Sequence, residues 1–557
     1  MKYQIRNRKN RRDFRKNRFL IPLILLRFTQ IPPSTYNPTF FLFLLPPYHN
    51  FISNTQTEGS PMKFLIFITS KVPTSALSVV LKTTLALCTF ASLSLLPYFA
   101  FSNSPRSADC PHCETVYRNS SSTRINSGLV RPLSFEAPTN LSHVLFGIAG
   151  SAQMWNDRRL YTELWWLPNV TRGYVWLDEE PLENTTRSPM TPPHRISADT
   201  SEFNYTCWYG SRSAIRIARI IKESFELGVD GLRWFVMGDD DTVFFTENLI
   251  TVLGKYDHNQ MYYIGANSES VEQDMIHSYT MAYGGGGFAI SYPLAKELVR
   301  ILDGCINRYA DLYGSDQKVQ GCLSEIGVPV TKELGFHQLD IRGCPYGLLA
   351  AHPLAPLVSF HHLDYVEPIF PSTDRIESVQ KLMNAHQLDP SRTLQHSFCY
   401  DPKRNWTVSI SWGYTVQLYP TLVPAKELET AFQTFQSWKS WSSEPFTFNT
   451  RGMSQNPCER PVVYFLDEAR NVGRGETLTT YLKYVEKEEC GRWDYAMVQR
   501  VRGFNVSALK FSPRWWSQAP RRQCCQVIGE EEEGEEVEVV RMKIRGCNPM
   551  ESVTPPP

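Results

Sequence analysis

The middle of the chain alternates between short apolar runs and amphipathic helical stretches, and this alternation limits the possible folds more than any other feature. The runs His143–Ala149, Gly173–Leu177 and Leu232–Met237 have the length and composition of buried strands. Ser151–Trp166 and Ser213–Leu227 lie between them with helical spacing of apolar residues. This order predicts an α/β domain with a mostly parallel sheet and helices on both faces. In such domains ligands bind at the carboxyl ends of the strands.

The chain has 557 residues, of which 42% are hydrophobic, so it can form more than one structural unit around large cores. This composition excludes a disordered tail and a collagen-like rod. The formal net charge is only +1, although residues 1–18 are strongly basic. Because the whole chain has no positive field, we expect no nucleic-acid polymer as a partner.

A stretch of nineteen residues without a charge, Thr83–Phe101, is long enough to cross the roughly 30 Å hydrocarbon layer as a helix. Lys82, Lys71 and the basic cluster at the start of the chain all precede it. The positive-inside rule therefore predicts a cytosolic segment 1–82, a single-pass signal anchor at 83–101 and a lumenal body. The alternatives are a cleaved signal peptide, with Met62 as the true start, and a buried helix.

Glycosylation signals and cysteines agree with a lumenal body. Seven Asn-X-Ser/Thr acceptors follow the anchor and none precedes it: Asn119, Asn140, Asn169, Asn184, Asn204, Asn405 and Asn505. Twelve of the thirteen cysteines also follow the anchor, and this even number suits an oxidising compartment. Their pairing cannot be deduced from the sequence.

The remaining segments divide by composition. Residues 102–139 are rich in Ser, Pro and Asn without apolar periodicity, which is typical of a flexible stem. We expect the α/β domain to cover residues 140–370. Residues 371–557 form a C-terminal accessory region that we expect to be rich in strands, because it contains the runs Thr407–Trp412, Val462–Leu466 and Val537–Lys543.

Three consecutive aspartates, Asp239, Asp240 and Asp241, follow the strand Leu232–Met237. Adjacent carboxylates repel one another, so they need a divalent cation or hydrogen bonds to compensate their charge. Oxygen ligands at a strand end suit Mn²⁺ or Mg²⁺ that bridges a diphosphate. The alternative is that Thr242 or Asp241 caps a helix around Glu247–Leu253.

Four consecutive glycines, Gly284–Gly287, precede the apolar run Phe288–Ser291. Glycines add no packing and cost conformational entropy, so they predict a backbone that must approach a ligand closely. The central pair, Gly285 and Gly286, are the candidates for that contact. A merely mobile turn is the alternative.

The order of the motifs resembles one family of transferases. The set consists of DDDT after an apolar strand, a glycine-rich loop followed by FAIS, Ser315-Asp316 six residues before Cys322, and Val358-Ser359-Phe360-His361. It resembles the fringe-like inverting glycosyltransferases of family 31, and most closely the plant fringe-related group catalogued as domain of unknown function 604. The likeness covers roughly residues 140–370, and the plant group's own tail would cover the remainder.

The resemblance implies a GT-A-like, Rossmann-related domain in a type II Golgi membrane protein. The implied activity moves a hexose or N-acetylhexosamine from a UDP-sugar to a hydroxyl of a glycan or glycoprotein acceptor, with inversion and a β1,3 link.

The resemblance also implies roles for individual residues. Asp241 and His361 would hold Mn²⁺, with Mg²⁺ as the alternative, and His362 competes with His361 for this role. Asp239 and Asp240 would lie around the ribose, phosphates and metal. Asp178, at the end of the second strand, would meet the uracil.

The same likeness assigns Asp316 as the catalytic base that accepts the proton of the attacking hydroxyl. Ser315 stands where the family has an acid and Gln320 where it has a glycine, and these departures bear on the choice of acceptor. The rival hypotheses are a catalytically degenerate lumenal binding or scaffold protein and a hydrolase that uses Asp240 and Asp316. Three tryptophans could stack on acceptor sugars, although aromatics at such spacing are more often core residues: Trp165, Trp166 and Trp208.

Overall fold

A computed structural model describes the body of the chain in five stretches: 137–181, 188–443, 445–485, 490–533 and 536–554. The expected anchor at 83–101, the basic segment before it and most of the expected stem lie outside these residues. Within the five stretches, no helix combines the length and the apolar character that a membrane crossing requires.

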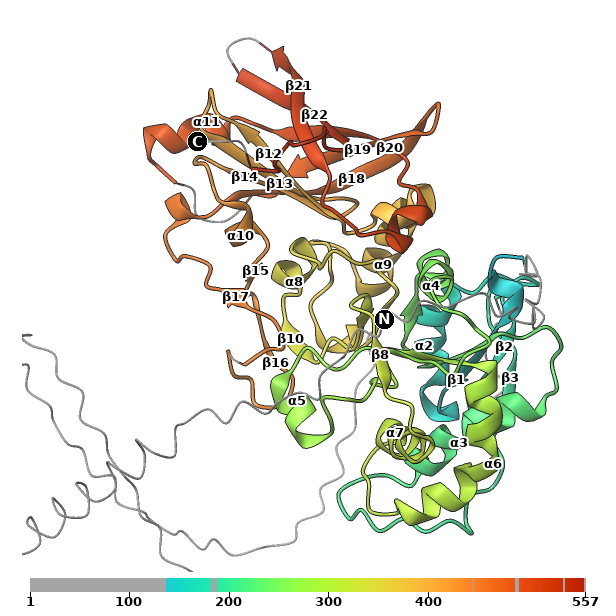
Figure 1. The fold of residues 1–557 in the computed structure, drawn as a ribbon. Coiled ribbons are helices and arrows are strands. Elements are labelled where there is room, and N and C mark those ends of the chain that lie inside the picture. Colours follow the sequence, from blue (N-terminus) through green and yellow to red (C-terminus); the bar gives the residue numbers. More distant parts are fainter. Residues whose placement is uncertain (1–136, 182–187, 444, 486–489, 534–535, 555–557) are drawn as a thin grey trace, which may run out of the picture. The chain divides into compact units, whose positions relative to one another are not determined.

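A seven-stranded mixed sheet forms the first part of the body, in the order β3-β2-β1-β4-β7-β6-β8 (Figure 1). Neighbouring strands are parallel except at β7, which runs antiparallel to both β4 and β6. The expected strands are therefore present, with one reversed member. Their bounds are Val144–Ala149 (β1), Gly173–Leu177 (β2), His194–Ile196 (β3), Trp234–Asp239 (β4), Tyr263–Gly265 (β6), Phe288–Ser291 (β7) and Val330–Lys332 (β8).

Helices pack on both faces of this sheet because successive side chains of its buried strands point to opposite sides. On β1, Phe146 and Ile148 join one core cluster, while Leu145 and Ala149 join the other. The first cluster includes side chains of α2 (Ala152–Glu163) and α4 (Thr246–Leu253). The second includes side chains of α3 (Ser213–Glu226), α6 (Tyr292–Arg308) and α7 (Ser315–Ile326).

Two helix boundaries affect the site. The helix α3 ends before Gly228, whose φ of +60° is the left-handed conformation expected at a helix stop. The helix α7 begins at Ser315. The side chain of Gln317 stabilises this start, because it accepts hydrogen bonds from the backbone N–H groups of Tyr313 (3.1 Å) and Gly314 (3.2 Å). Asp316 therefore lies in the first turn of the helix.

A small three-stranded sheet brings distant segments together. β11 (Ser359–Phe360) pairs antiparallel with β5 (Val243–Phe244) and parallel with β9 (Phe336–His337). The residue after β11 is His361, and β5 directly follows the aspartate turn. The pairing of Phe360 with Val243 therefore sets His361 beside the aspartates.

A second pairing ties the C-terminal region to the site region: β10 (Ile341–Gly343) runs antiparallel to β16 (Phe435–Ser437).

The remaining helices and strands connect these parts, together with short 3₁₀ turns. They are α5 (Val271–Ile276), α8 (Tyr346–Ala350), α9 (Arg375–Leu388), α10 (Ala425–Leu428), β15 (Ala431–Phe432), β17 (Thr450–Arg451) and α11 (Trp493–Gln499).

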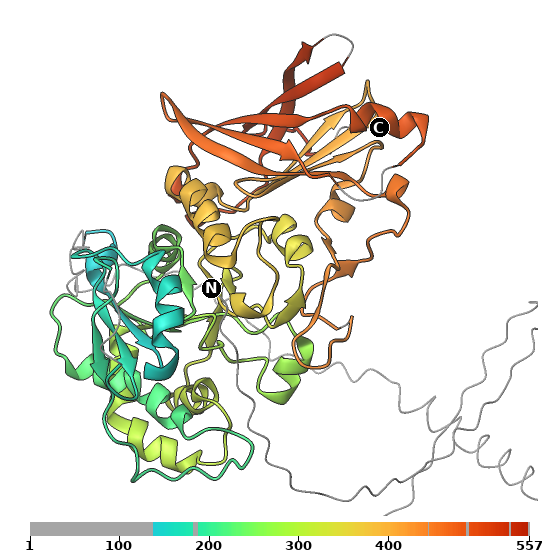
Figure 2. The ribbon, with the colours of Figure 1, turned by 180° about the vertical axis from the view of Figure 1, so that it is seen from behind.

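The strand-rich C-terminal region contains a closed barrel of eight strands, drawn in orange to red in Figure 2. Each of the three apolar runs singled out in the sequence lies in one of its strands. The strands in barrel order are His396–Asp401 (β12), Trp406–Ser411 (β13), Thr415–Tyr419 (β14), Val462–Gly473 (β18), Glu476–Lys483 (β19), Gly503–Leu509 (β20), Glu536–Arg545 (β22) and Cys524–Glu533 (β21).

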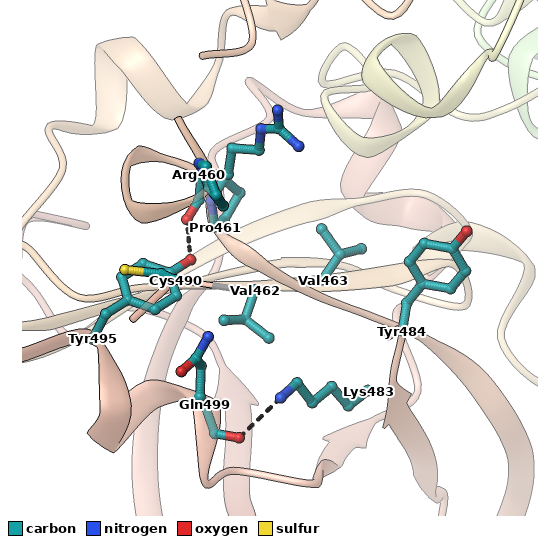
Figure 3. Close-up of a pocket in the computed structure, with 10 residues that line it drawn as sticks. Arg460, Pro461, Val462, Val463, Lys483, Tyr484, Cys490, Tyr495 and Gln499 are labelled. Atoms are coloured by element: carbon teal, nitrogen blue, oxygen red, sulfur yellow. Dashed lines mark hydrogen bonds between the residues drawn. The ribbon is translucent and has the colours of Figure 1, made fainter. Parts of the chain in front are cut away.

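The barrel carries a small hollow of about 40 Å³ (Figure 3). At its border the Tyr495 hydroxyl donates a hydrogen bond to the carbonyl of Arg460, and Lys483 Nζ donates one to the carbonyl of Gln499 at 3.0 Å. Pockets for small molecules begin near roughly 300 Å³. The hollow is therefore too small to be a substrate site.

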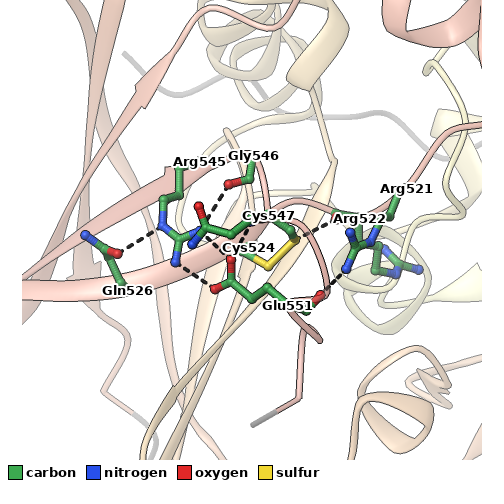
Figure 4. The surroundings of a disulfide bond; sticks show 9 residues. Arg521, Arg522, Cys524, Gln526, Arg545, Gly546, Cys547 and Glu551 are labelled. Carbon is green, nitrogen blue, oxygen red and sulfur yellow. Dashed lines mark hydrogen bonds and ion pairs between the residues drawn. A yellow bond between two sulfur atoms is a disulfide. The ribbon is translucent and has the colours of Figure 1, made fainter.

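Four disulfides join eight of the ten described cysteines. Cys305–Cys322 links α6 to α7, and the others are Cys399–Cys525, Cys458–Cys490 and Cys524–Cys547. The last bridge fixes the end of the chain, where the two carboxylate oxygens of Glu551 accept hydrogen bonds from the Arg545 guanidinium at 2.7 and 2.8 Å (Figure 4). Cys207 and Cys344 have no disulfide partner among the described residues.

Candidate active site

The aspartate triplet forms a tight turn at the end of β4. The N–H of Thr242 donates to the carbonyl of Asp239 at 3.0 Å. The Thr242 hydroxyl accepts a hydrogen bond from the N–H of Asp239 (2.8 Å) and donates one to the carbonyl of Gly285 (2.7 Å). The helix α4 has Phe245 as its N-cap, with no side-chain cap hydrogen bond. The hypothesis that Asp241 or Thr242 caps this helix is therefore wrong.

Asp239, Asp241 and His361 form a cluster that could hold a metal ion, because one ligand atom from each lies within 4.8 Å of the others. His361 Nε2 is 3.2 Å from Asp241 Oδ1 and 3.7 Å from Asp239 Oδ2. Neither carboxylate oxygen of the fully buried Asp241 has an aligned hydrogen-bond donor among the described residues. A buried carboxylate with two such oxygens fits a divalent cation, and carboxylate and imidazole groups are both ligands of such ions.

Arg158, on α2, compensates part of the acidic charge. Its guanidinium lies 3.0 Å from Asp240 Oδ1 and 3.1 Å from Asp241 Oδ2. Burial raises the pKa of Asp240 to about 6, and the neighbouring Asp241 charge adds to this effect. Burial would also raise the pKa of Asp241, but the charges of His361 and Arg158 hold it well below its usual range. Asp241 is thus the carboxylate that stays ionised.

The imidazole of His361 is protonated at neutral pH when no metal is bound. Burial would lower its pKa, but the charge of Asp241 outweighs that effect and raises the pKa to about 9. In the metal-free protein the imidazolium therefore supplies a positive charge beside the carboxylates.

This raised pKa predicts a pH dependence of stability. A proton held more tightly in the folded chain stabilises it fully below the unfolded pKa of about 6.5, and this stabilisation is lost as the pH rises through about 9. We expect the midpoint temperature of unfolding, measured in EDTA, to fall as the pH rises from about 6.5 to about 9. In the His361→Gln variant this fall with pH should be smaller. An equal slope in both proteins would contradict the assignment.

The glycine loop Gly284–Gly287 packs against the same histidine. A Cβ on Gly285 would lie 2.1 Å from His361 Cε1, which leaves room only for glycine. The N–H of Gly286 donates to Gln338 Oε1 at 2.6 Å, and Gly287 has a φ of +84°. The sequence predicted a close approach of this backbone to a ligand. In the structure this backbone closely approaches His361, the histidine of the candidate metal cluster. Gly285 also lines the cavity described below.

We therefore expect Gly285→Ala to displace the His361 ring and to weaken Mn²⁺ binding by roughly tenfold or more, as loss of an orienting contact does at metal sites. Titration of the folded variant with Mn²⁺ measures this change. The matched control is Gly452→Ala, where an added Cβ meets nothing within 4 Å. Equal affinities of the two variants would show that the close packing has no role in metal binding.

Asp316 lies in the first turn of α7. Its carboxylate accepts hydrogen bonds from the N–H of Gly284 (3.3 Å) and of Gln317 (2.9 Å). Burial raises its pKa above the usual range, which suits a group that must accept a proton. Asp316 lines a cavity of about 400 Å³ together with Asp239 and His361. The candidate base and two members of the metal cluster therefore share one cavity of the size of small-molecule sites.

The other predicted residues lie in different surroundings. Asp178 accepts a hydrogen bond from the N–H of Ala152 at 2.8 Å, at the N-terminus of α2, and this bond holds its pKa below the usual range although burial would raise it. Asp240 faces Arg158. Ser315 lines the cavity, whereas Gln320 bonds to Ser324 one turn further along α7.

Of the three tryptophans, two are core residues and one is not. Trp165 and Trp166 are buried in the large core cluster, and Trp165 Nε1 donates to the carbonyl of Thr242 at 3.0 Å. Trp208 is exposed. The core interpretation therefore holds for the first two residues alone.

One wall of the cavity comes from the C-terminal region, which sequence reasoning missed. Trp438, just after β16, stacks on His362 with ring centroids 4.1 Å apart and planes at 5°. The His362 ring lies 3.8 Å from that of His361, and its Nδ1 is 3.0 Å from Asp340 Oδ1. These contacts leave His361, rather than His362, facing the aspartates.

We expect Trp438→Ala to weaken Mn²⁺ binding by about tenfold or less, because Trp438 acts on the candidate ligand His361 only through the ring of His362. Trp438→Phe should restore most of the affinity, since it keeps a ring on His362. Metal titration of both variants is the test. An unchanged affinity in the alanine variant would limit Trp438 to a structural role.

A larger cavity of about 510 Å³ is a weaker candidate. Its buried acid, Glu269, is already satisfied by His337 Nδ1 at 3.1 Å and by the N–H of Leu339 at 2.8 Å. His337 in turn lies 3.0 Å from His352, which contacts a backbone carbonyl. No unpaired carboxylate lines this second cavity among its described residues.

Comparisons with known proteins found similarity in parts of this chain. The model of the family described as "Protein of unknown function, DUF604" matches residues 273–525, slightly less than half of the chain. A mouse protein named β-1,3-glucosyltransferase is 30% identical over 139 residues, which are 25% of this chain. The match spans only 27% of that relative's own length.

A solved structure is also similar in part. It is that of a glycosyltransferase involved in the glycosylation of the major capsid of PBCV-1, with 14% identity over 43% of this chain and 98% of the other. Its TM-score of 0.23 is too low to support a conclusion about the fold. Taken with the family match, the mouse relative supports a relationship of this chain to glycosyltransferases.

Proposed function

We propose that this protein is an inverting, metal-dependent glycosyltransferase that moves a hexose or N-acetylhexosamine from a UDP-sugar to a hydroxyl of a glycan or glycoprotein, with a β1,3 link. The observation that supports this most is the convergence of Asp239, Asp241 and His361 at one side of the cavity that Asp316 also lines. The similarity to a β-1,3-glucosyltransferase supports the reaction class and the linkage.

The reaction follows from the charges of the site. The acceptor oxygen bonds to the anomeric carbon while the bond from that carbon to the UDP oxygen breaks, and the bonding electron pair leaves with the diphosphate. Asp316 takes the hydroxyl proton, and attack from the face opposite the leaving group inverts the anomeric centre. Asp239, Asp241 and His361 would hold the cation, which would supply positive charge beside the departing diphosphate. Arg158 keeps the Asp241 carboxylate ionised and in position.

The rival hypotheses fit the geometry less well. A hydrolase would need Asp240 in the cavity, but this carboxylate is 98% buried and pairs with Arg158. A catalytically inactive binding protein would keep the cavity and the metal cluster without needing a base. Asp316 lines the cavity and accepts two backbone hydrogen bonds, a position that suits a base and favours the enzyme.

We further propose a Golgi membrane location, with a single-pass anchor at 83–101 and the body in the lumen. The charge-free stretch and the positions of the glycosylation acceptors support this orientation. The four disulfides support passage through an oxidising compartment.

The test is an activity screen of the full chain. We expect release of UDP from one member of a panel of UDP-sugars in the presence of Mn²⁺, and loss of that release in EDTA. A chain that binds UDP with Mn²⁺ but releases none from any UDP-sugar, with or without glycan acceptors, would be the binding protein instead.

A further inference from the structure

Three aromatic side chains form a ladder from the surface to the mouth of the cavity. We call this ladder the aromatic shelf: Trp208, Tyr209 and Tyr313. The ring of Tyr209 stacks on that of Tyr313, with centroids 5.5 Å apart and planes at 12°, and Trp208 stands edge-on to Tyr209 at 5.3 Å. Tyr313 lines the cavity and lies three residues before Asp316. The shelf is thus continuous with the side of the cavity that holds the candidate base.

The shelf is exposed to an unusual degree for aromatic residues. The exposed fractions are 91% for Trp208, 58% for Tyr209 and 41% for Tyr313. An indole so exposed adds almost nothing to the folded core, because hydrophobic stabilisation follows the area removed from water. Large apolar surfaces left exposed beside a cavity mark interaction sites.

The protein nevertheless holds the shelf in place. The N–H of Gly210 donates to the carbonyl of Cys207 at 3.3 Å and closes a turn around Trp208 and Tyr209. The Tyr205 hydroxyl donates to the carbonyl of Tyr313 at 2.8 Å, which ties this turn to the loop before α7. A Cβ on Gly210 would lie 1.9 Å from the Tyr205 hydroxyl, so the turn is packed closely. A turn that is ordered before binding loses less conformational entropy when a ligand binds to it.

The chemistry of the shelf suits a sugar ring. A pyranose has an apolar C–H face that stacks on an aromatic plane and a rim of hydroxyls that needs hydrogen-bond partners. The hydroxyl-bearing side chains Ser211 and Ser213 line the cavity next to the shelf. The metal cluster, where the diphosphate of the donor would bind, includes no residue of the shelf.

We propose that Trp208 and Tyr209 bind a pyranose ring of the acceptor glycan, one or more residues away from the hydroxyl that reacts near Asp316. This inference rests on the proposed function, since it assigns the partner of the same site. It predicts an extended oligosaccharide, rather than a single sugar or a bare peptide, as the preferred acceptor.

The test measures glycan binding and nucleotide binding separately. Asn204 is an exposed glycosylation acceptor four residues before Trp208, so all proteins carry Asn204→Gln to prevent a glycan of the chain itself from reaching the shelf. The full chain is applied to an array of oligosaccharides that end in β-galactose, β-glucose, β-N-acetylglucosamine or fucose. Binding of UDP with Mn²⁺ is measured in parallel.

We expect Trp208→Ala to reduce binding to the preferred glycans by about tenfold or more, the range expected for loss of one aromatic stacking partner. Trp208→Phe should keep most of the binding, and Tyr484→Ala, an exposed tyrosine outside the shelf, should keep all of it. UDP binding should be equal in all variants.

Equal glycan binding by the alanine variant, or no glycan binding by the parent protein, would overturn the proposal. If the chain binds glycans in a way that depends on Trp208 but binds no UDP, the glycan-binding role of the shelf stands and the proposed transferase function is wrong. The two proposals can therefore fail independently.

Discussion

Replacement of Asp316 by asparagine is expected to lower the rate of sugar transfer by about 10²–10⁴-fold, the contribution of a general base. Asparagine keeps the size of the side chain and can still accept one of the two backbone hydrogen bonds, since those from Gly284 and Gln317 go to different carboxylate oxygens. It cannot take the proton of an attacking hydroxyl at neutral pH. Since Asp316 is not part of the metal cluster, the affinity for UDP and Mn²⁺ should change little.

Steady-state transfer and UDP titration on the same protein preparation measure both quantities. The matched control is Asp257→Asn, because Asp257 also accepts a backbone hydrogen bond, from Asn259 at 3.0 Å, but does not line the cavity. Undiminished transfer by Asp316→Asn would remove Asp316 from the mechanism. A parallel loss of UDP binding would assign it to donor binding instead.

Replacement of Asp241 by asparagine should have an equally large effect on an earlier step. The substitution removes the ionised carboxylate that faces both His361 and Arg158. We expect the affinity for Mn²⁺ to fall by about 10²-fold or more, since even the partners of metal ligands are worth 10–100-fold. Metal-dependent UDP binding and transfer should be lost together.

The burial of Asp241 raises the question of whether the variant folds. Its thermal unfolding is therefore measured first, in EDTA, beside Asp240→Asn, which also removes a charge paired with Arg158. If both variants fold and only Asp241→Asn loses Mn²⁺ binding, the assignment of Asp241 stands. Equal metal binding by the two variants would contradict it.

Patterns that are local in the sequence predicted much of the fold. The alternation of apolar runs and helices identified β1, β2 and α3 nearly residue by residue, because buried strands and amphipathic helices differ in period. The reversed strand β7 was not foreseen, since a buried strand has the same composition in either direction. The closed barrel was foreseen only as a strand-rich region, because closure depends on which strands pair.

The candidate site was predictable to the extent that its residues lie in distinctive motifs. The aspartate triplet and the segment that ends in His361 were identified from their order along the chain, and the structure brings Asp239, Asp241 and His361 together. Arg158 was noticed only as part of a helix, because its partner carboxylates depend on how α2 packs. Trp438 carried no local signal, since its role arises from the pairing of β10 with β16. The glycine loop was correctly expected to need a close approach, but its partner in the structure is His361.

The central claim is that Asp239, Asp241 and His361 hold a divalent cation that UDP needs for binding. Calorimetric titration of UDP into the full chain, in saturating Mn²⁺ and in EDTA, tests this claim most directly. We predict tight binding with Mn²⁺, little or none in EDTA, and no effect of Mn²⁺ in the His361→Gln variant. UDP binding of equal strength with and without the metal in the unmodified chain would contradict the account.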